Sequence, residues 1–181
     1  KDHEELPETG AGGFDPFKKY KVNVLVDNCE TCGAPVVMET NPNYYNLFGM
    51  LEYQDVKGMA VTDFTRIKPG ALHKANGGYL ILQAKDLLAH PICWEALKRA
   101  IKNKEIRIEN IGEQTKILPI SSLKPEPVSL SVKIILIGSQ EIYHLLYNFD
   151  EDFRKYFKIM ADFDSDMPLT DQHVEKYASF I

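Results

Sequence analysis

Two cysteines, Cys29 and Cys32, form the pair whose spacing most directly suggests chemistry. A Cys-x-x-Cys pair supplies two of the four ligands of a structural zinc site, and a second pair of Cys or His residues normally supplies the rest. Cys93 and the five histidines are scattered, with no second pair at ligand spacing. No thioredoxin-like strand–helix–strand pattern follows the pair. We therefore expect no metal site, and an independent binding domain with a zinc knuckle remains the alternative.

Other reactive residues lack the spacing that catalysis requires. Asp162, Asp164 and Asp166 alternate, but they lack the Gly and the distal Glu of a calcium loop, so we interpret them as solvated. No set of Ser, His and Asp has an interpretable spacing, and the sequence contains no Gly-x-x-x-x-Gly-Lys-[Ser/Thr] phosphate loop. The chain by itself is expected to cleave nothing and to hold no cofactor.

The composition limits the class of protein. With 181 residues, 44% of them hydrophobic and 26% charged, the chain is long enough for one packed domain with an appendage. A net charge of -5 argues against nucleic acid or an anionic membrane as the main partner. No apolar run approaches the roughly 20 residues of a membrane span. Three cysteines cannot build a disulfide framework, so we expect a cytoplasmic protein.

The first third of the chain predicts few regular elements. Residues 1–13 are charged and Gly-rich and predict a flexible linker. The chain begins with Lys1, so we expect a piece cut from a longer protein. Apolar and polar residues alternate over Tyr20–Asn28, which predicts a strand. Val36–Met38 forms a second short apolar stretch, and loops with short elements are expected from residue 43 to residue 70.

The rest of the chain alternates strands and helices. Two apolar runs, Tyr79–Leu82 and Val132–Ile137, are typical of strands buried on both faces, which favours a parallel α/β sheet. Alternation over Glu105–Asn110, followed by Thr115–Leu118, predicts a hairpin. A further strand is expected over Ile159–Phe163. Helices are expected over the following ranges: 71–75, 85–90, 91–104, 141–148, 150–157 and 170–181.

Several of these segments together resemble a known family. Pro69–Leu82 resembles the approach to a Walker B strand, and Val24–Asn28 resembles the strand before a pore-loop region. Glu126–Val128 with Val132–Gly138 resembles a hairpin exit and a sensor-1 strand, and Glu151–Phe163 resembles the arginine-finger region. The set covers the chain from about Asp15 onward. It is similar to the AAA+ module of Lon-like ATP-dependent proteases, in the bacterial branch with a large insertion after the phosphate loop.

The resemblance implies a fold and a role in a larger parent protein. The fold would be an incomplete AAA+ P-loop NTPase-type core with a parallel sheet flanked by helices and a β-hairpin insertion. Residues 14–168 would form this partial domain, and 169–181 would start a helical lid or connecting helix. The parent would be a homohexameric serine endopeptidase that uses ATP and Mg and engages unfolded protein. The alternative is a non-hydrolysing scaffold that shapes the entrance of a protease chamber. Because the first strand and the phosphate loop are missing, we expect an uncovered sheet edge or face and self-association.

The resemblance also assigns nucleotide-site positions. The two Walker B carboxylate positions fall on Gln83 and Ala84, which cannot orient magnesium and water as two carboxylates would. We therefore predict poor ATP hydrolysis, although Gln83 is equally well an ordinary polar residue at a strand end. Sensor 1 falls on Ser139, which is alternatively a residue of the turn that ends the strand. Arg154 is the candidate arginine finger, although the family pattern falls nearer Tyr156.

Two segments could contact a protein substrate in the pore of a ring. The first contains Met59, Ala60 and Val61, where a flexible Gly beside Met suits an adaptable grip. The second is the expected hairpin tip with Ile111 and Gly112. Ordinary packing is the alternative for Met59.

Overall fold

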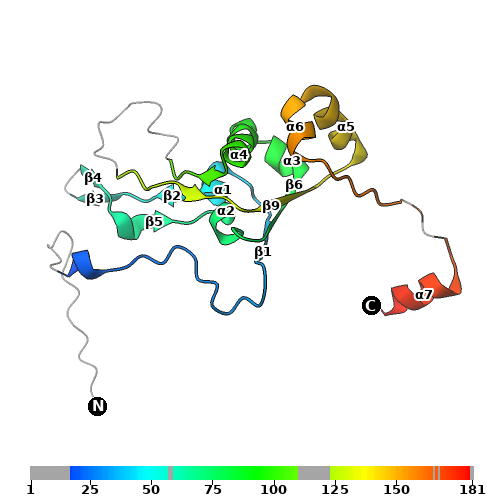
Figure 1. The fold of residues 1–181 in the computed structure, drawn as a ribbon, viewed down its shortest axis with the longest axis horizontal. Helices are drawn as coiled ribbons and strands as arrows, with labels where there is room; N and C mark the ends of the chain where they lie inside the picture. Colours follow the sequence, from blue (N-terminus) through cyan, green and yellow to red (C-terminus); the bar gives the residue numbers. More distant parts are fainter. Residues whose placement is uncertain (1–16, 57–58, 110–122, 165, 167, 180–181) are drawn as a thin grey trace, which may run out of the picture. The chain divides into compact units, whose positions relative to one another are not determined.

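The computed structural model describes residues 17–56, 59–109, 123–164, 166 and 168–179 (Figure 1). The chain divides into two units, Lys1–Leu145 and Leu146–Ile181, and each is described separately. The elements of the first unit follow in chain order: η1 (Lys18–Tyr20), β1 (Val36–Glu39), α1 (Tyr44–Phe48), β2 (Met50–Leu51), β3 (Gln54–Val56), β4 (Met59–Val61), η2 (Phe64–Arg66), β5 (Ile67–Lys68), α2 (Ala71–Lys74), β6 (Tyr79–Gln83), α3 (Ala84–Leu88), α4 (Pro91–Asn103), β7 (Glu105–Ile106), β8 (Val128–Ser129) and β9 (Lys133–Ile137). Helix α5 (Gln140–Phe149) spans the boundary between the units.

The main sheet has three parallel strands in the order β1-β6-β9 (Figure 1). Tyr79 pairs with Lys133, and Gln83 pairs with Ile137. The two apolar runs therefore lie side by side as predicted, and the mixed α/β fold with a parallel sheet flanked by helices is confirmed. The short stretch around Val37 is the third strand, paired with Leu80.

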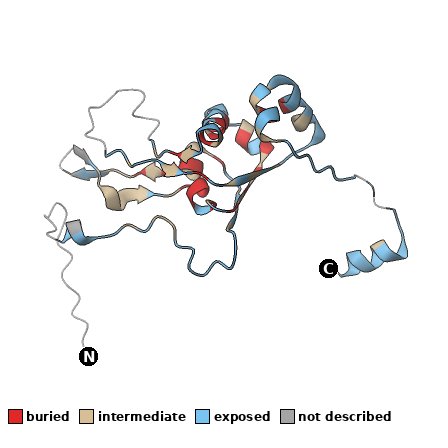
Figure 2. Ribbon diagram, viewed as in Figure 1, coloured by how far each residue is buried: buried red, intermediate tan, exposed pale blue. Residues whose placement is uncertain are grey.

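Helices cover one face of this sheet. Leu80 and Leu82 of β6 are fully buried. Figure 2 shows buried residues, in red, in the helices α2, α3 and α4 as well. Helix α2 contacts β1, α3 contacts β6, and α4 packs on α3. The following helix residues complete this core: Leu47, Leu72, Leu87 and Leu97.

The other face of the sheet is exposed. Val36 and Met38 of β1 are 64% and 54% exposed, and Ile135 and Ile137 of β9 are 43% and 45% exposed. The prediction that the Val132–Ile137 strand is buried on both faces is therefore wrong, because the helices of the described chain pack on one side only. Among the described residues, one face of the sheet is therefore uncovered, as expected.

Two adjacent glycines, Gly77 and Gly78, allow β6 to enter the sheet. Gly77 has φ +86°, a left-handed conformation that side chains rarely adopt. A Cβ atom on Gly78 would lie 1.9 Å from the backbone oxygen of Pro35, which accepts the N–H of Tyr79 at 2.8 Å. The glycine pair thus sets the close approach of β1 to β6.

Asn76 joins the segments that precede two neighbouring strands. Its side-chain amide donates to the Ser129 carbonyl oxygen at 2.9 Å, and its side-chain oxygen accepts the Ser131 N–H at 2.8 Å. The N–H of Gly77 donates to the Ser131 carbonyl oxygen at 2.8 Å. These three hydrogen bonds, with a fourth from the Lys133 N–H to the Gly78 carbonyl oxygen at 2.9 Å, hold the entrances to β6 and β9 together.

Helix α4 is the longest described helix, with 13 residues. Pro91 occupies its first turn, where backbone N–H groups have no partner within the helix, so the lack of an N–H in proline costs no helical hydrogen bond. The helix ends at Lys104, whose φ of 55° is the left-handed cap conformation usually taken by Gly. No helix among the described residues is both long and apolar enough to span a membrane.

Short antiparallel pairs complete the first unit. Strand β2 pairs with β5, β3 with β4, and β7 with β8. The hairpin predicted over residues 105–118 is partly described. Its first arm starts at β7, whose described partner is Val128–Ser129, and the expected return arm Thr115–Leu118 lies outside the described residues.

The strand predicted over Tyr20–Asn28 is wrong. The chain leaves η1 at Tyr20 and continues without regular structure, with Val22 84% and Val24 68% exposed. Asn23 attaches the segment through its side chain, which donates to the carbonyl oxygens of Phe64 and Ile67. Side-chain hydrogen bonds thus attach this segment in place of the backbone hydrogen bonds of a strand. Alternation of apolar and polar residues alone does not provide a neighbouring strand to pair with.

The second unit contains α6 (Glu151–Tyr156) and α7 (Asp171–Ala178), both at predicted positions. Asp150 caps α6 and Thr170 caps α7 through their side-chain oxygens. The strand predicted over Ile159–Phe163 is wrong. Its two end residues are 92% and 88% exposed, and no described strand pairs with it. The flexible linker predicted for residues 1–13 lies outside the described residues.

Candidate functional site

The carboxyl edge of the main sheet brings two of the predicted nucleotide-site positions together. Gln83 ends β6 and is the register partner of Ile137, which ends β9. Gly138 and Ser139 follow directly, so Gln83 and Ser139 emerge at the same edge. This is the edge at which parallel α/β sheets bind their ligands.

Ala84 lies in a tight contact at this edge. It begins α3 and is 3% exposed. A Cβ atom on Gly138 would lie 3.2 Å from the Ala84 Cβ atom. The two small residues allow α3 to approach the end of β9, and a longer side chain at either position would have to displace its neighbours.

Ser139 is engaged at the start of α5. Its carbonyl oxygen accepts the N–H of Tyr143 at 3.1 Å. A hydrogen bond between Ser139 and the Glu141 carboxylate lowers the pKa of Glu141. These contacts give Ser139 a structural role at a helix start, beside the sensor-1 role predicted for it.

The donor groups at this edge do not fit Mg–ATP hydrolysis. Gln83 offers a neutral amide, Ala84 a methyl group, and Ser139 a hydroxyl that is hydrogen-bonded to Glu141. Asp86 lies in the exposed first turn of α3 rather than at the end of the strand. Magnesium sites in nucleotide enzymes use a carboxylate at the strand end, which these positions do not provide.

Arg154 belongs to the second unit. It lies on α6, with its guanidinium carbon 5.1 Å from the centre of the Tyr147 ring. Its arginine-finger role stays a prediction.

The predicted substrate-contacting residues fall on a hairpin and on a segment that the structure does not describe. Met59, Ala60 and Val61 form β4, which pairs with β3, and Val61 is 44% exposed. Ile111 and Gly112 lie outside the described residues. The pore role of both segments stays a prediction.

Cys29 and Cys32 are free and exposed, whereas Cys93 is buried. The Asp27 carboxylate accepts the N–H of Cys29 at 3.0 Å and also contacts its Sγ atom. Hydrogen bonds from the Cys29 side chain and backbone lower the pKa of Asp27. In the described part of the chain, no three His, Cys, Asp or Glu side chains are grouped so that they could hold a metal.

His73 is a buried titratable residue of α2. Its Nδ1 atom accepts the N–H of Gly70 at 3.3 Å, so the ring caps the first turn of its own helix. Its Nε2 atom has no hydrogen-bond partner in the described structure. Burial lowers the pKa of His73, so the ring is neutral at neutral pH.

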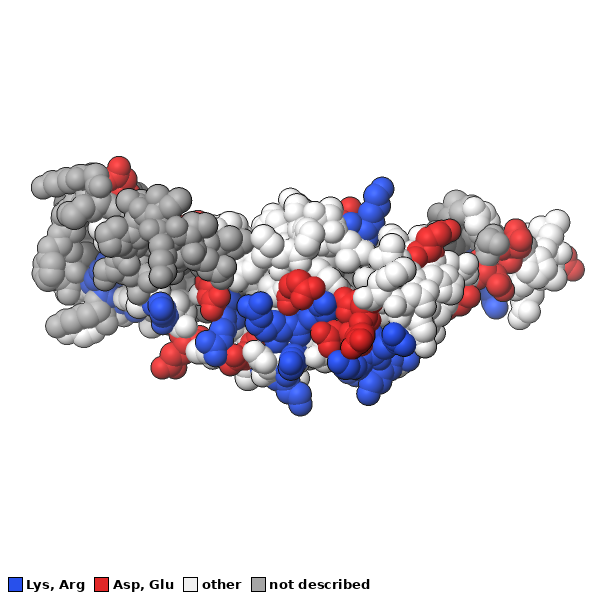
Figure 3. Space-filling model, turned by 90° about the horizontal axis from the view of Figure 1, so that it is seen from above, with Lys and Arg blue, Asp and Glu red and all other residues white. Residues whose placement is uncertain are grey.

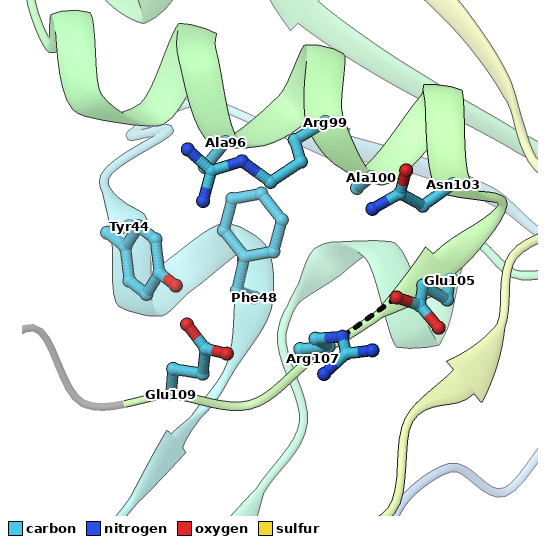
Figure 4. Close-up of a pocket in the computed structure, with 9 residues that line it drawn as sticks. All are labelled: Tyr44, Phe48, Ala96, Arg99, Ala100, Asn103, Glu105, Arg107 and Glu109. Atoms are coloured by element: carbon cyan, nitrogen blue, oxygen red, sulfur yellow. Dashed lines mark hydrogen bonds and ion pairs between the residues drawn. The ribbon is translucent and has the colours of Figure 1, made fainter.

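The structure adds a depression that sequence reasoning missed. It has a volume of about 80 Å³ and lies between α1, α4 and the segment after β7 (Figure 4). Its wall includes Tyr44 and Phe48 of α1 and Arg99 of α4. Because it forms only where α1 packs against α4, no local pattern predicts it, although Ala96 and Ala100 share one face of α4 at a spacing of four residues.

Comparisons with known proteins identify relatives of this chain. The model of a family described as "LonB-like, AAA domain" matches residues 32–164, well over half of the chain. An Escherichia coli (strain K12) protein named "Putative Lon protease homolog" is 37% identical over 76 residues. That match covers 41% of this chain and 12% of the relative, so the chain corresponds to a small part of it. The solved structure of NtrX from Brucella abortus is 20% identical, with a TM-score of 0.41, over 68% of this chain and 24% of that chain.

Proposed function

The chain belongs to the LonB-like AAA domain family, and we propose that it is part of the AAA+ module of a Lon-like ATP-dependent serine protease. The observation that carries the proposal is the parallel pairing of β6 with β9, whose carboxyl ends lie at one edge. Nucleotides bind at this edge in related α/β sheets. In the parent, the module forms a homohexameric ring in the cytoplasm and engages unfolded protein, and ATP with Mg is held by residues other than Gln83, Ala84 and Ser139.

Within this module, the edge around Gln83 contributes little to ATP hydrolysis. Gln83 and Ala84 stand at the two carboxylate positions, and neither can polarise water. We therefore expect that Gln83→Ala leaves the rate of ATP hydrolysis by the parent unchanged. Brisk turnover that Gln83→Ala abolishes would contradict this assignment.

Engagement of unfolded protein is proposed for the β3–β4 hairpin. The test measures degradation of an unfolded model protein, casein, by the parent with ATP, beside cleavage of a short fluorogenic peptide. Met59→Asp is expected to reduce casein degradation at least tenfold while peptide cleavage continues, because a short peptide needs no threading. Met160→Asp, which changes an exposed Met outside the hairpin, is the matched control. Undiminished casein degradation by Met59→Asp would remove the hairpin from substrate engagement.

A second function is favoured by the packing of Ala84 against Gly138. Ala84 places a methyl group beside Gly138 and supplies no catalytic carboxylate, which supports a non-hydrolysing scaffold at the entrance of a protease chamber. Steady-state ATP hydrolysis by the purified parent distinguishes the two functions, because a scaffold predicts none.

A further inference from the structure

The depression beside α4 combines aromatic rings with a floor of small side chains. The Tyr44 and Phe48 rings stack with centres 4.8 Å apart, and Phe48 is 3% exposed. Ala96 and Ala100 lie one helical turn apart on α4 and leave the space open. Such a surface suits an apolar side chain.

Within the described part of the chain, two charged side chains beside these rings have no ionic partner. The Nε atom of Arg107 lies 2.8 Å from the Glu105 carboxylate, so these two charges satisfy each other. No ion pair joins Arg99 or Glu109 to another described residue. Figure 4 shows Arg99 and Glu109 on opposite sides of the two rings. Both charges act on the Tyr44 hydroxyl: after the effect of burial, Glu109 raises its pKa and Arg99 lowers it.

The size of the depression selects the kind of ligand. Small-molecule sites usually enclose about 300–1,000 Å³. The roughly 80 Å³ here accommodates one side chain rather than a nucleotide or a cofactor. Figure 3 shows both signs of charge on one face of the molecule. The lining of the depression itself carries two arginines and two glutamates, Arg99, Arg107, Glu105 and Glu109, which favours a ligand of mixed charge over a polyanion.

We propose that this depression binds a short peptide segment of a partner protein in which an apolar residue lies between an acidic and a basic residue. The apolar side chain packs on Tyr44 and Phe48, the acidic residue pairs with Arg99, and the basic residue pairs with Glu109. This binding involves neither the sheet edge nor ATP, so it does not depend on the proposed function.

The test is an NMR titration of the isotope-labelled chain with acetyl-Gly-Glu-Leu-Lys-Gly-amide. One anchor and two exposed ion pairs predict a Kd on the order of 1 mM, with shifts at the amides of Tyr44, Ala96 and Arg99. A peptide with Gly in place of Leu is expected to cause no such shifts. Equal shifts from both peptides, or shifts confined to other parts of the chain, would overturn the proposal.

Charge reversal gives a positive readout that misfolding cannot imitate. Arg99→Glu is expected to weaken the Glu-Leu-Lys peptide about two- to fivefold and to strengthen the Lys-Leu-Lys peptide by a similar factor. Lys102→Glu makes the same charge change at an exposed position of α4 that does not line the depression. The proposal fails if both variants change the two affinities equally.

Discussion

The backbone oxygen of Pro35 lies 1.9 Å from the point that a Cβ atom on Gly78 would occupy. Because the obstructing atom belongs to the backbone of the segment entering β1, it cannot rotate away. Gly78→Ala is therefore expected to destabilise the chain by about 3 kcal/mol, through displacement of β1 from β6. The measurement is the urea unfolding free energy, followed by circular dichroism.

Gly77→Ala is the matched control for this prediction. A Cβ atom there meets nothing within 4 Å, so only its φ of +86° opposes the change. Its expected cost is about 1–2 kcal/mol. If Gly78→Ala proves no more costly than Gly77→Ala, the contact with Pro35 does not limit the approach of the strands.

Lys104→Gly is expected to stabilise the chain by about 0.5–1 kcal/mol. Lys104 holds the left-handed conformation at the end of α4, which Gly adopts without steric cost. Lys102→Gly, at a helical position in the last turn of the same helix, should instead destabilise it by up to about 1 kcal/mol. The urea midpoints of the two variants should therefore move in opposite directions. A shift in the same direction would contradict the claim that the left-handed conformation of Lys104 carries a steric cost.

Stability is expected to fall as the pH drops below about 6.5 because of His73. Burial lowers its pKa from 6.5, so the unfolded chain binds a proton that the folded chain does not. Protonation of His73 in the unfolded chain lowers the free energy of unfolding by at most about 1.4 kcal/mol per pH unit as the pH falls. The contribution of His73 to stability is fully present above pH 6.5. The measurement is the urea midpoint between pH 5 and pH 8.

His73→Gln tests the origin of this pH dependence. Gln keeps an oxygen that can accept the Gly70 N–H but carries no titrating group, so the slope near pH 6 should flatten. His144→Gln changes an exposed histidine and retains His73, so it should keep that contribution. An equal slope in both variants would exclude His73 as its source.

Self-association is expected through the exposed face of the main sheet. Apolar side chains from β1 and β9, including Met38 and Ile135, face solvent there. Ile135→Lys is expected to lower the average mass measured by light scattering at high concentration. Ile92→Lys changes an exposed isoleucine of α4 and should have less effect. A clean monomer of the unchanged chain at high concentration would contradict the expectation.

Much of the fold could be predicted because its strongest signals are local. Apolar runs identified β6 and β9, and helical periodicity with Pro91 identified α4. The error at Tyr20–Asn28 has a different origin. Alternation of apolar and polar residues is compatible with a strand, but a strand forms only where a neighbouring backbone accepts and donates its hydrogen bonds. Here the Asn23 side chain, rather than the backbone, makes the hydrogen bond to the neighbouring segment.

Part of the candidate site could likewise be predicted from the sequence, and part of it could not. Gln83 and Ser139 could be placed at one edge because parallel strands end together. The depression around Arg99 could not be predicted, because its walls come from segments about fifty residues apart whose packing leaves no trace in local spacing. The tight contact between Ala84 and Gly138 likewise joins residues far apart in the sequence, and no local pattern predicts it.

The three hydrogen bonds around Asn76 have a consequence for how the chain tolerates change. They bring the two ends of the stretch from Asn76 to Ser131 together, so that β6, which begins this stretch, and β9, which follows it, enter the sheet side by side. Residues added or removed in the middle of that stretch need not alter the alignment of the strands at its two ends. The length of the chain between β6 and β9 can therefore vary while the pairing of these two strands is kept.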